Sequence, residues 1–321
     1  MVKTDIVREY RTKFPDYPNL KLARIIYQKE SKLFTSVDGV RSILRAIEGK
    51  SGSRMKVTHK VDNRPYNPYK LPESDEVVFE PYKIVGHKKI GILSDIHLPY
   101  HSIEALTVAI DYLKKEKIDA LLLNGDVLDF HGLSRFCKDP RKKNFAQELE
   151  TWKQLFKVFQ RELNCKIYYK LGNHEARYEH YLWTKAGELT GVEEFDLSNI
   201  LHARAEGITV IKDKTIMKAG SLNIIHGHEF GQSVFSPVSI ARGLYMRGKV
   251  NAIQGHNHRS SSHTEKDMEG KIVTTWSLGC LCELNPEYLP VNNWNHGFAV
   301  VDLDGKEFHV RNYSIYKGKV Y

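Results

Sequence analysis

Seven polar side chains, each at the end of a short apolar run, constrain this chain more than any other feature of its sequence. They are Asp95, His97, Asp126, Asn173, His226, His256 and His258. Short apolar, β-branched runs predict buried strands, and α/β sheets place their ligands in the loops that follow strands. All seven side chains offer oxygen or nitrogen atoms, which divalent metals accept as ligands. The pattern therefore predicts a sheet whose loop edge can bind metal ions.

From residue 84 onward, strand and helix patterns alternate before they give way to hairpins. The segments "KIGILSD", "SIEALTVAIDYLKKE" and "IDALLLNGD" predict a strand, an amphipathic helix capped by Ser102 and a second strand, which together make a parallel βαβ unit. Further helices are predicted at roughly 145–163 and 175–188, and turns at 268–270 and 304–305 predict β-hairpins near the end. We therefore expect an α/β domain over residues 84–321, with two packed mixed β-sheets flanked by helices.

The first 60 residues differ from the rest of the chain in pattern and charge. Apolar residues at helical spacing predict three short helices over residues 2–48, the third of them capped by Ser36 and ended by Gly49. Residues 1–60 hold 14 Lys/Arg and 6 Asp/Glu, against 34 and 33 in the remainder. A basic three-helix module over residues 1–50 resembles a helix-turn-helix and indicates nucleic-acid binding. A generic interaction domain with a solvated charged face is the alternative.

The basic side chains of this region are the candidate nucleic-acid contacts, namely Arg41, Arg45, Lys50 and Arg54. Arg41 and Arg45 are four residues apart and share one face of the third predicted helix. Residues 51–83 are expected to form a linker, because prolines interrupt any regular element there.

The composition also excludes several classes of protein. No apolar run approaches the roughly 20 residues that a membrane helix needs. The first residues, "MVKTDIVREYRTKF", lack the apolar stretch of a signal peptide. Four cysteines without a CxxC pair make neither a disulfide framework nor a thiolate zinc site. We expect a cytoplasmic protein without a membrane partner, and the sequence leaves its oligomeric state open.

The order of the short motifs is more specific than any one of them. DxH, GDxxD, GNHE, HGH and GHxH occur in turn as "SDIHL", "GDVLD", "GNHE", "HGH" and "GHNH". This series resembles the calcineurin-like metallophosphoesterase superfamily, and the layout with an N-terminal helical module is similar to that of some phage-encoded phosphoesterases. The resemblance implies an αββα sandwich and an enzyme that hydrolyses phosphoester bonds. A phage-encoded protein would act in the host cytoplasm.

The resemblance also implies a role for each position. Asp95, His97 and His258 would bind one metal, Asn173, His226 and His256 the other, and Asp126 would bridge the two. A hydroxide held between the metals would attack phosphorus in line with the leaving oxygen. A donor set of oxygen and nitrogen without sulfur favours Mn²⁺, with Fe or Zn²⁺ as alternatives.

Other side chains are expected beside the metals. His174 would protonate the leaving oxygen or bind the transition-state charge. Asp129 would orient His174, unless it is a local turn cap. His228, Arg177 and His131 are candidates for contacts around the metals or with substrate.

One departure from the family bears on the substrate. Calcineurin-type protein phosphatases carry an Arg directly after the second Asp of GDxxD, where this chain has Phe130 and His131 in "GDVLDFHG". The missing Arg favours a phosphodiesterase or nuclease acting on DNA or another nucleic acid. Tyr288 and Trp294 in a predicted loop, or Trp183, could stack on a base. A phosphomonoesterase or nucleotide hydrolase is the first alternative, and a DNA-binding or assembly protein with an incidental catalytic fold is the second.

Overall fold

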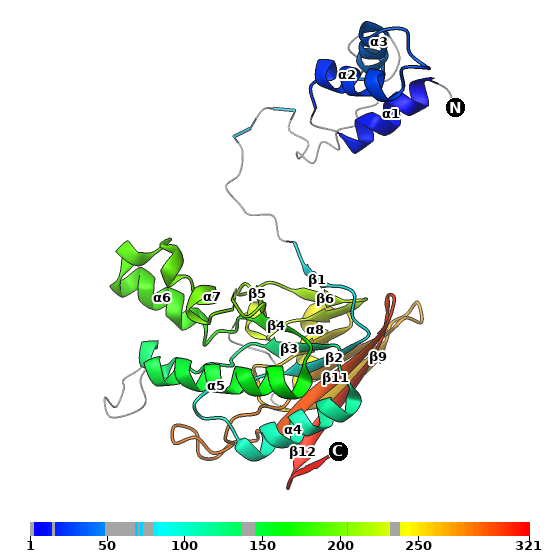
Figure 1. Cartoon of the computed structure of the whole chain (residues 1–321). Helices are drawn as coiled ribbons and strands as arrows, with labels where there is room; N and C mark the ends of the chain where they lie inside the picture. The colour runs from blue at the N-terminus through cyan, green and yellow to red at the C-terminus, as the bar shows by residue number, and fades with distance from the viewer. Residues whose placement is uncertain are drawn as a thin grey trace. The chain divides into compact units, whose positions relative to one another are not determined.

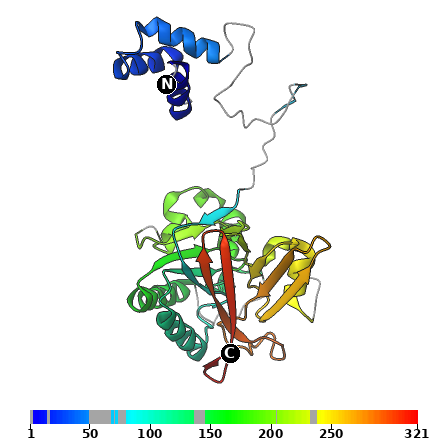
Figure 2. The same ribbon diagram turned by 90° about the vertical axis from the view of Figure 1, so that its right-hand side faces the viewer.

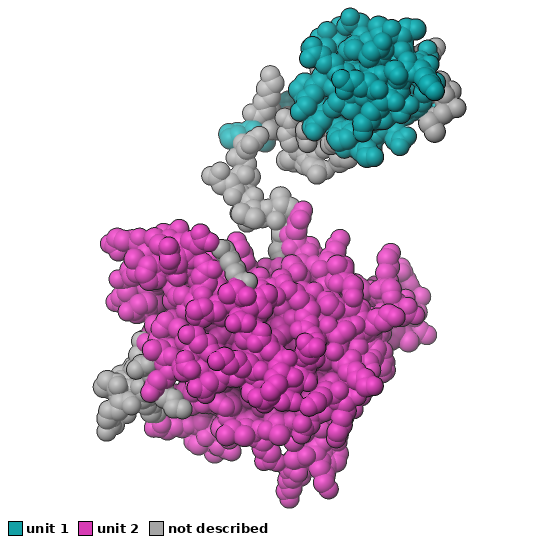
Figure 3. Space-filling view, viewed as in Figure 1, with its two compact units in different colours: residues 1–77 teal, residues 78–321 magenta. Residues whose placement is uncertain are grey.

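The computed structural model describes residues 3–14, 17–48, 68–69, 71–72, 80–135, 145–203, 205–231 and 238–321. The chain divides into two compact units, residues 1–77 and 78–321 (Figure 3). None of the helices in these described ranges is long and apolar enough to cross a membrane.

The first unit contains the three helices that the apolar spacing predicts. They are α1 (Lys3–Lys13), α2 (Asn19–Lys29) and α3 (Val37–Ile47). Buried side chains from all three helices, among them Val7, Ile26 and Leu44, pack into one small core. Ser36 caps α3 as expected, since its hydroxyl accepts the backbone N–H of Gly39 at 3.1 Å. The predicted stop at Gly49 lies outside the described residues.

The second unit contains alternating strands and helices followed by antiparallel strands (Figure 1). Its helices are α4 (Ile103–Glu116), α5 (Phe145–Leu163), α6 (Ala176–Lys185), α7 (Leu197–Ile200) and α8 (Ile240–Gly248), with 3₁₀ turns at His131–Leu133, Gly187–Leu189, Glu193–Phe195 and His228–Phe230. Its strands are β1 (Tyr82–Ile84), β2 (Lys89–Leu93), β3 (Ala120–Asn124), β4 (Lys166–Lys170), β5 (Thr209–Ile211), β6 (Met217–Ala219), β7 (Leu222–Ile224), β8 (Ala252–Gln254), β9 (Ser261–Lys266), β10 (Ile272–Ser277), β11 (His296–Asp304), β12 (Glu307–Tyr316) and β13 (Lys319–Val320).

These strands form two mixed sheets in the described part of the chain. One sheet has the order β1-β6-β7-β8-β10-β9, and the other has the order β13-β12-β11-β2-β3-β4-β5. Strands β2 and β3 pair in parallel, with Ile90 opposite Ala120, so the predicted βαβ unit through α4 is confirmed. The two predicted hairpins are the antiparallel pairs β9–β10 and β11–β12.

The sheets pack face to face, and helices cover their outer faces. Ile90 and Ile92 of β2 share a core with Ile224 of β7 and Ile253 of β8, which lies between the sheets. The opposite face of the second sheet packs on α4 and α5 through side chains such as Leu113. Helix α8 contacts β8, β9 and β10 of the first sheet, and Figure 2 shows it on the side away from α4 and α5. The expected αββα sandwich is confirmed.

Strand β1 begins within the range expected to be linker. Tyr82 and Lys83 pair in parallel with Met217 and Lys218 of β6, so the sheet includes residues before 84. Within this strand Lys83 is exposed and Ile84 is buried, at 3 % exposure. Main-chain pairing with a neighbouring strand therefore sets this boundary, which the proline pattern does not reveal.

Candidate metal centre

The loops that follow five strands bring the seven candidate ligands together. Asp95 and His97 follow β2, Asp126 follows β3 and Asn173 follows β4, which are parallel neighbours in one sheet. His226 follows β7 and His256 and His258 follow β8, which are parallel neighbours in the other sheet. Because parallel strands end at the same edge, each sheet gathers its donors in one place.

Main-chain hydrogen bonds join these loops to one another. The backbone N–H of Asp95 donates to the carbonyl of Gly125 at 3.1 Å and joins the loops after β2 and β3. The N–H of Gly255 donates to the carbonyl of His226 at 2.8 Å. The N–H of His256 donates to the Asp95 carboxylate at 2.9 Å and so connects the two groups of loops. The positions of the donors are thus fixed by the backbone as well as by the sheets.

The donors form two groups that share Asp126. In one group, Nε2 of His258 lies 3.2 Å from Asp95 Oδ1 and 3.1 Å from His97 Nε2. In the other, Nε2 of His226 lies 3.1 Å from Asp126 Oδ2 and 3.2 Å from Asn173 Oδ1. A side-chain nitrogen of His256 lies with Asp126 and His226 inside a 4.8 Å cluster. Oδ2 of Asp126 is also 4.0 Å from His97 Nε2, so its carboxylate faces both groups.

Hydrogen bonds on the far side of two imidazoles leave their other nitrogens facing the centre. Nδ1 of His226 lies 2.8 Å from the Asn124 carbonyl, which can only accept, so Nδ1 carries the proton. Nδ1 of His97 lies 3.0 Å from Asp129 Oδ1, which fixes the same tautomer. Among the described residues, the buried Nδ1 of His256 has no hydrogen-bond partner. This donor chemistry fits two divalent cations.

Five of the seven candidate ligands have a left-handed backbone. Their φ angles are 56° for Asp95, 51° for His97, 52° for Asp126, 68° for His256 and 55° for His258. Such values are rare for residues other than glycine, and Asp and His tolerate them better than most. The left-handed turn re-aims the side chain after each strand. It brings Asp95 and His97 to one centre although they are two apart and would face opposite ways in extended chain.

Two glycines make room where these loops touch. Gly125, directly before Asp126, has a φ of 86°, which agrees with the predicted sharp turn. A Cβ added at Gly172 would overlap the Asp126 carboxylate. A Cβ at Gly125 would overlap the His226 ring, so both positions require glycine.

A buried carboxylate beneath the centre holds its main loop. Glu175 is 0 % exposed and accepts the backbone N–H groups of Asp126, Val127, Leu128 and Gly172 at 2.8–3.0 Å. It also accepts the hydroxyl of Tyr169 at 2.9 Å. Glu175 is the last residue of the GNHE motif, and its role was not predicted from the sequence.

A second carboxylate holds the "HGH" loop. Glu229 accepts the backbone N–H groups of His226 at 2.9 Å and Gly227 at 2.6 Å. Nζ of Lys170 lies 2.9 Å from Glu229 Oε1, and Nδ1 of His228 lies 3.8 Å from Oε2. Burial raises the pKa of Glu229, but the charge and hydrogen bond of Lys170 outweigh burial and lower it to about 2. Glu229 was also missed, because its partners are backbone amides that have no sequence signature.

His174 and Asp129 lie together beside the first group, as the sequence analysis expects. Nδ1 of His174 is 3.0 Å from Asp129 Oδ1, and Nε2 is 3.8 Å from Asp126 Oδ2. The same Asp129 oxygen also contacts Nδ1 of His97, which was not predicted. Arg177 donates to the Asp129 carbonyl at 2.7 Å and lies 3.0 Å from His174 Nε2. Arg177 therefore borders the reacting centre.

The ionisation of these groups follows from their neighbours. Burial raises the pKa of Asp129, but hydrogen bonds from His174 and His97 outweigh burial and lower it well below the usual range. Burial lowers the pKa of His226, but the charge of Asp126 outweighs it and raises the pKa to about 10. A cation bound by His226 must displace that proton, so metal binding here releases protons.

The less specific candidates fall in different places. His228 hydrogen-bonds to Asp213, and its ring lies 5.3 Å from that of His226, so it flanks the second group. His131 lines a cavity beside His97. Trp183 is 57 % exposed on α6 and pairs with the ring of His180.

The residues of the first unit belong to a separate body. Arg45 is exposed on α3, and Arg41 is partly buried 4.0 Å from Asp38. Lys50 and Arg54 lie outside the described residues. Residues 1–48 hold ten Lys/Arg and six Asp/Glu, so half of the +8 excess over residues 1–60 comes from the segment after α3.

Phe130 shows why an arginine is absent after Asp129. Its side chain is 0 % exposed, and its ring lies 5.2 Å from Phe145 and 6.4 Å from Tyr178. The position therefore points into an aromatic core and away from the metal donors. An arginine there would place an unpaired charge in that core.

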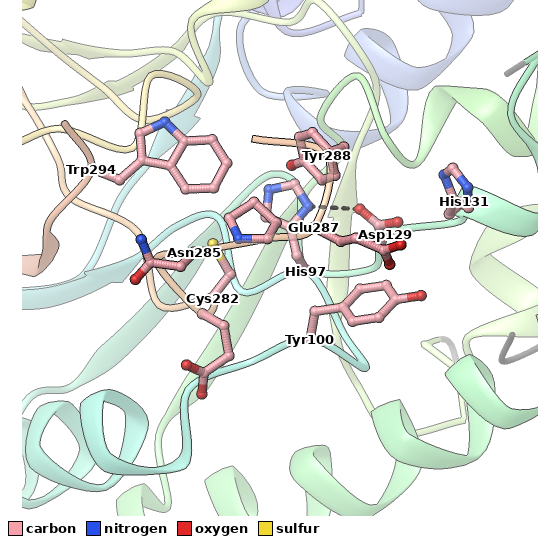
Figure 4. Close-up of a pocket in the computed structure, with 11 residues that line it drawn as sticks. His97, Tyr100, Asp129, His131, Cys282, Asn285, Glu287, Tyr288 and Trp294 are labelled. Carbon is pink, nitrogen blue, oxygen red and sulfur yellow. Dashed lines mark hydrogen bonds and ion pairs between the residues drawn. The ribbon is translucent and has the colours of Figure 1, made fainter. Parts of the chain in front are cut away.

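The cavity beside His97 has a volume of about 320 Å³ and is lined mainly by the loop between β10 and β11. Figure 4 shows Trp294 and Tyr288 above His97 and Tyr100 below it. Cys282 is a further lining residue, and its sulfur lies 3.9 Å from His258 Nδ1. The loop and its aromatic residues Tyr288 and Trp294 were predicted from the sequence, whereas the nearby Cys282 thiol was not.

Comparison with known proteins places the chain in a family. A family model for calcineurin-like phosphoesterases matches residues 88–260, a range that contains all seven candidate ligands. The "Gene 54 protein" of Mycobacterium phage L5 is 28 % identical over 237 residues, which cover 70 % of this chain and 91 % of that protein. The protein of the same name from Mycobacterium phage D29 is 25 % identical over the same length and the same shares.

Solved structures also match. Wild-type Vps29 of Entamoeba histolytica, complexed with Zn²⁺, is 16 % identical with a TM-score of 0.39, and the match covers 73 % of this chain and 96 % of Vps29. The family match spans more than half of the present chain. The chain therefore belongs to the calcineurin-like phosphoesterase family of dinuclear-metal hydrolases that act on phosphoester bonds.

Proposed function

We propose that this phosphoesterase is a phosphodiesterase that acts on nucleic acid, with DNA as the preferred substrate. The observation that carries the diester assignment is the burial of Phe130 against Phe145. A monoester carries one more negative charge than a diester, and the arginine that would meet that charge in a protein phosphatase is replaced by a core residue.

The residues that would hold the metals follow from the two donor groups. Asp95, His97 and His258 would bind one cation, and Asn173, His226 and His256 the other, with Asp126 between them. When bound, two divalent cations lower the pKa of coordinated water and neutralise charge on the phosphoryl oxygens. We propose Mn²⁺ as the native metal, because imidazole, carboxylate and amide donors without sulfur suit it.

His174 is the proposed general acid. Asp129 accepts its Nδ1–H, which holds the ring so that Nε2 faces Asp126 and the reacting phosphate. Burial lowers the pKa of His174, but the charge of Asp126 and the hydrogen bond to Asp129 outweigh burial and raise it. A raised pKa favours the protonated ring, from which Nε2 can deliver a proton to the leaving oxygen.

The first unit supports the nucleic-acid assignment. Arg45 is exposed on α3, whose opposite face packs into the core through Val40 and Leu44. Exposed basic side chains bind the phosphate backbone without reading sequence. Lys50 and Arg54 extend the proposed contact along the chain.

A phosphomonoesterase is the second candidate, and Arg177 is the observation that favours it. Its guanidinium lies 3.0 Å from His174 Nε2 and is 19 % exposed. A cation in this place could meet the extra charge of a monoester from the α6 side of the centre, in place of the arginine missing after Asp129.

Hydrolysis of matched substrates tests the proposal. Purified full-length protein with Mn²⁺ is assayed on bis-p-nitrophenyl phosphate, p-nitrophenyl phosphate and labelled single- and double-stranded DNA. The proposal expects turnover of the diester and of DNA. Faster hydrolysis of the monoester, together with intact DNA, would establish the second candidate instead. Arg45→Ala, with the exposed Arg161→Ala on α5 as control, should weaken DNA cleavage and leave the rate on the small diester unchanged.

A further inference from the structure

The cavity beside the metal donors is lined by aromatic side chains and carboxylates, which the hydrolysis of a phosphoester does not itself require. His97 and Asp129 form its inner wall, so a molecule held there adjoins the reacting phosphate. The remaining wall carries the rings of Tyr100, Tyr288 and Trp294. A volume of about 320 Å³ is at the small end of ligand sites, which span about 300–1,000 Å³. The cavity therefore suits one compact planar group.

The aromatic wall is held in place by its own loop. Asn292 donates to the carbonyls of Leu284 and Leu289 at 2.6 and 2.9 Å, and its side-chain oxygen accepts the N–H of Trp294. The Trp294 ring lies 4.1 Å from the ring of His258, one of the candidate ligands. The stacking surface is thus fixed relative to the metal donors before any ligand arrives.

The charged side chains that line the cavity are carboxylates, and Arg177 lies beside it, 3.9 Å from Asp129 Oδ2. Glu283 and Glu287 line it together with Asp129, and the described lining residues include no Lys or Arg. Carboxylates would repel a second phosphate, so a polynucleotide cannot continue through this cavity. They accept hydrogen bonds from the exocyclic amino and ring N–H groups of nucleobases, as Glu and Asp do for the amino group of cytosine.

We propose that this cavity binds a single amino-bearing nucleobase, that of the terminal nucleoside esterified to the scissile phosphate. The base stacks on Tyr288 and Trp294, and Glu283 or Glu287 accepts from its N–H groups. Guanine, adenine and cytosine fit this chemistry, whereas thymine lacks the amino group. The remainder of the strand leaves on the other side of the metals. This inference rests on the proposed function, since it takes a nucleotide ester as the substrate.

Binding of a product nucleotide tests the cavity apart from catalysis. Calorimetry on the Mn²⁺-loaded full-length protein compares 2′-deoxyguanosine 5′-monophosphate, thymidine 5′-monophosphate and 2-deoxyribose 5-phosphate. Because each base stacked on an aromatic ring is worth about 5- to 150-fold in affinity, the guanine nucleotide should bind at least about 10-fold tighter than the sugar phosphate. The thymine nucleotide should fall between them.

Two variants separate stacking from hydrogen bonding. Tyr288 is 75 % exposed, so Tyr288→Ala leaves the core intact and should reduce the preference for nucleotide over sugar phosphate. Tyr316→Ala, at a 62 % exposed tyrosine on β12, is the matched control and should retain that preference. Glu283→Gln combined with Glu287→Gln should abolish the preference for guanine over thymine.

Equal affinity of the wild type for nucleotide and sugar phosphate would overturn the inference, as would an undiminished preference in Tyr288→Ala. Either result leaves the hydrolysis of DNA and small diesters untouched as evidence for the proposed function. Conversely, selective binding of the guanine nucleotide by a protein that cleaves only monoesters would support the base-binding cavity and contradict the diester assignment.

Discussion

Replacing Glu175 by glutamine tests whether the buried carboxylate organises the metal centre. Burial raises the pKa of Glu175, but its two oxygens face five donors, namely four backbone N–H groups and the Tyr169 hydroxyl. Only the ionised form accepts from all of them. Glutamine has nearly the same shape, yet it offers one acceptor oxygen and brings two donors of its own.

The size of the effect follows from the contacts. Oε1 accepts from Val127, Leu128 and Tyr169, and Oε2 accepts from Asp126 and Gly172. Whichever way the amide is turned, at least two buried N–H groups lose their acceptor. Each unpaired buried donor costs about 1–3 kcal/mol, so Glu175→Gln should destabilise the second unit by about 2–6 kcal/mol.

Thermal unfolding of the full-length protein, followed by circular dichroism, measures this loss. At about 2–4 °C for each kcal/mol in a unit of this size, the midpoint should fall by roughly 5–20 °C. Mn²⁺ affinity should fall by about 10- to 100-fold, because the N–H of Asp126 is no longer held. Glu179→Gln, at an exposed position of α6, is the control and should change neither quantity. A Glu175→Gln midpoint within 2 °C of the wild type would refute the reasoning.

Three further predictions concern other parts of the chain. Burial raises the pKa of Glu148 from 4.5 to about 8, so the stability of the wild type should fall as the pH rises between these values. Glu148→Gln still accepts the N–H of Phe130 and should be more stable than the wild type by up to about 3 kcal/mol at pH 8. Urea titrations at pH 8 and near pH 4 would measure this difference, which should vanish near pH 4. His174→Ala should slow the cleavage of diesters with alkyl leaving groups by about 100-fold or more, and that of p-nitrophenyl diesters far less, because only a poor leaving oxygen needs a proton. Equal losses of the two steady-state rates would contradict the acid role. Ser36→Ala removes the acceptor for the N–H of Gly39 and should cost about 1 kcal/mol, seen as faster hydrogen exchange in the first turn of α3 and unchanged exchange in α4.

The sequence predicted the sheets and the donor positions because both depend on local patterns. Buried parallel strands are continuous apolar runs, and each run is followed by a candidate ligand such as Asp126 or His226. The register of β2 on β3 then brings the loops together. The predicted contact between Asp129 and His174 also appears, since both lie in short motifs of fixed spacing.

The supporting contacts could not be predicted from residue types alone. Glu175 and Glu229 bind backbone amides, which every residue has, so no pattern marks their partners. The shared contact of Asp129 with His97 depends on the separation of the β2 and β3 loops. The sequence shows that Phe130 stands where a protein phosphatase has an arginine. The burial of Phe130 against Phe145 and Tyr178 depends on the packing of α5 and α6, which the sequence does not show.

The left-handed backbone at five candidate ligands sets stability against activity. Each such residue costs about 1–2 kcal/mol relative to a right-handed one, and together they are comparable with the whole stability of a typical domain. Glycine adopts this conformation at lower cost. A library selected only for resistance to heat should therefore accumulate glycine at Asp95, His97, Asp126, His256 and His258. Thermostable survivors of that selection would keep the sandwich and lose the metals, and the positions that change first would mark the catalytic centre without any activity assay.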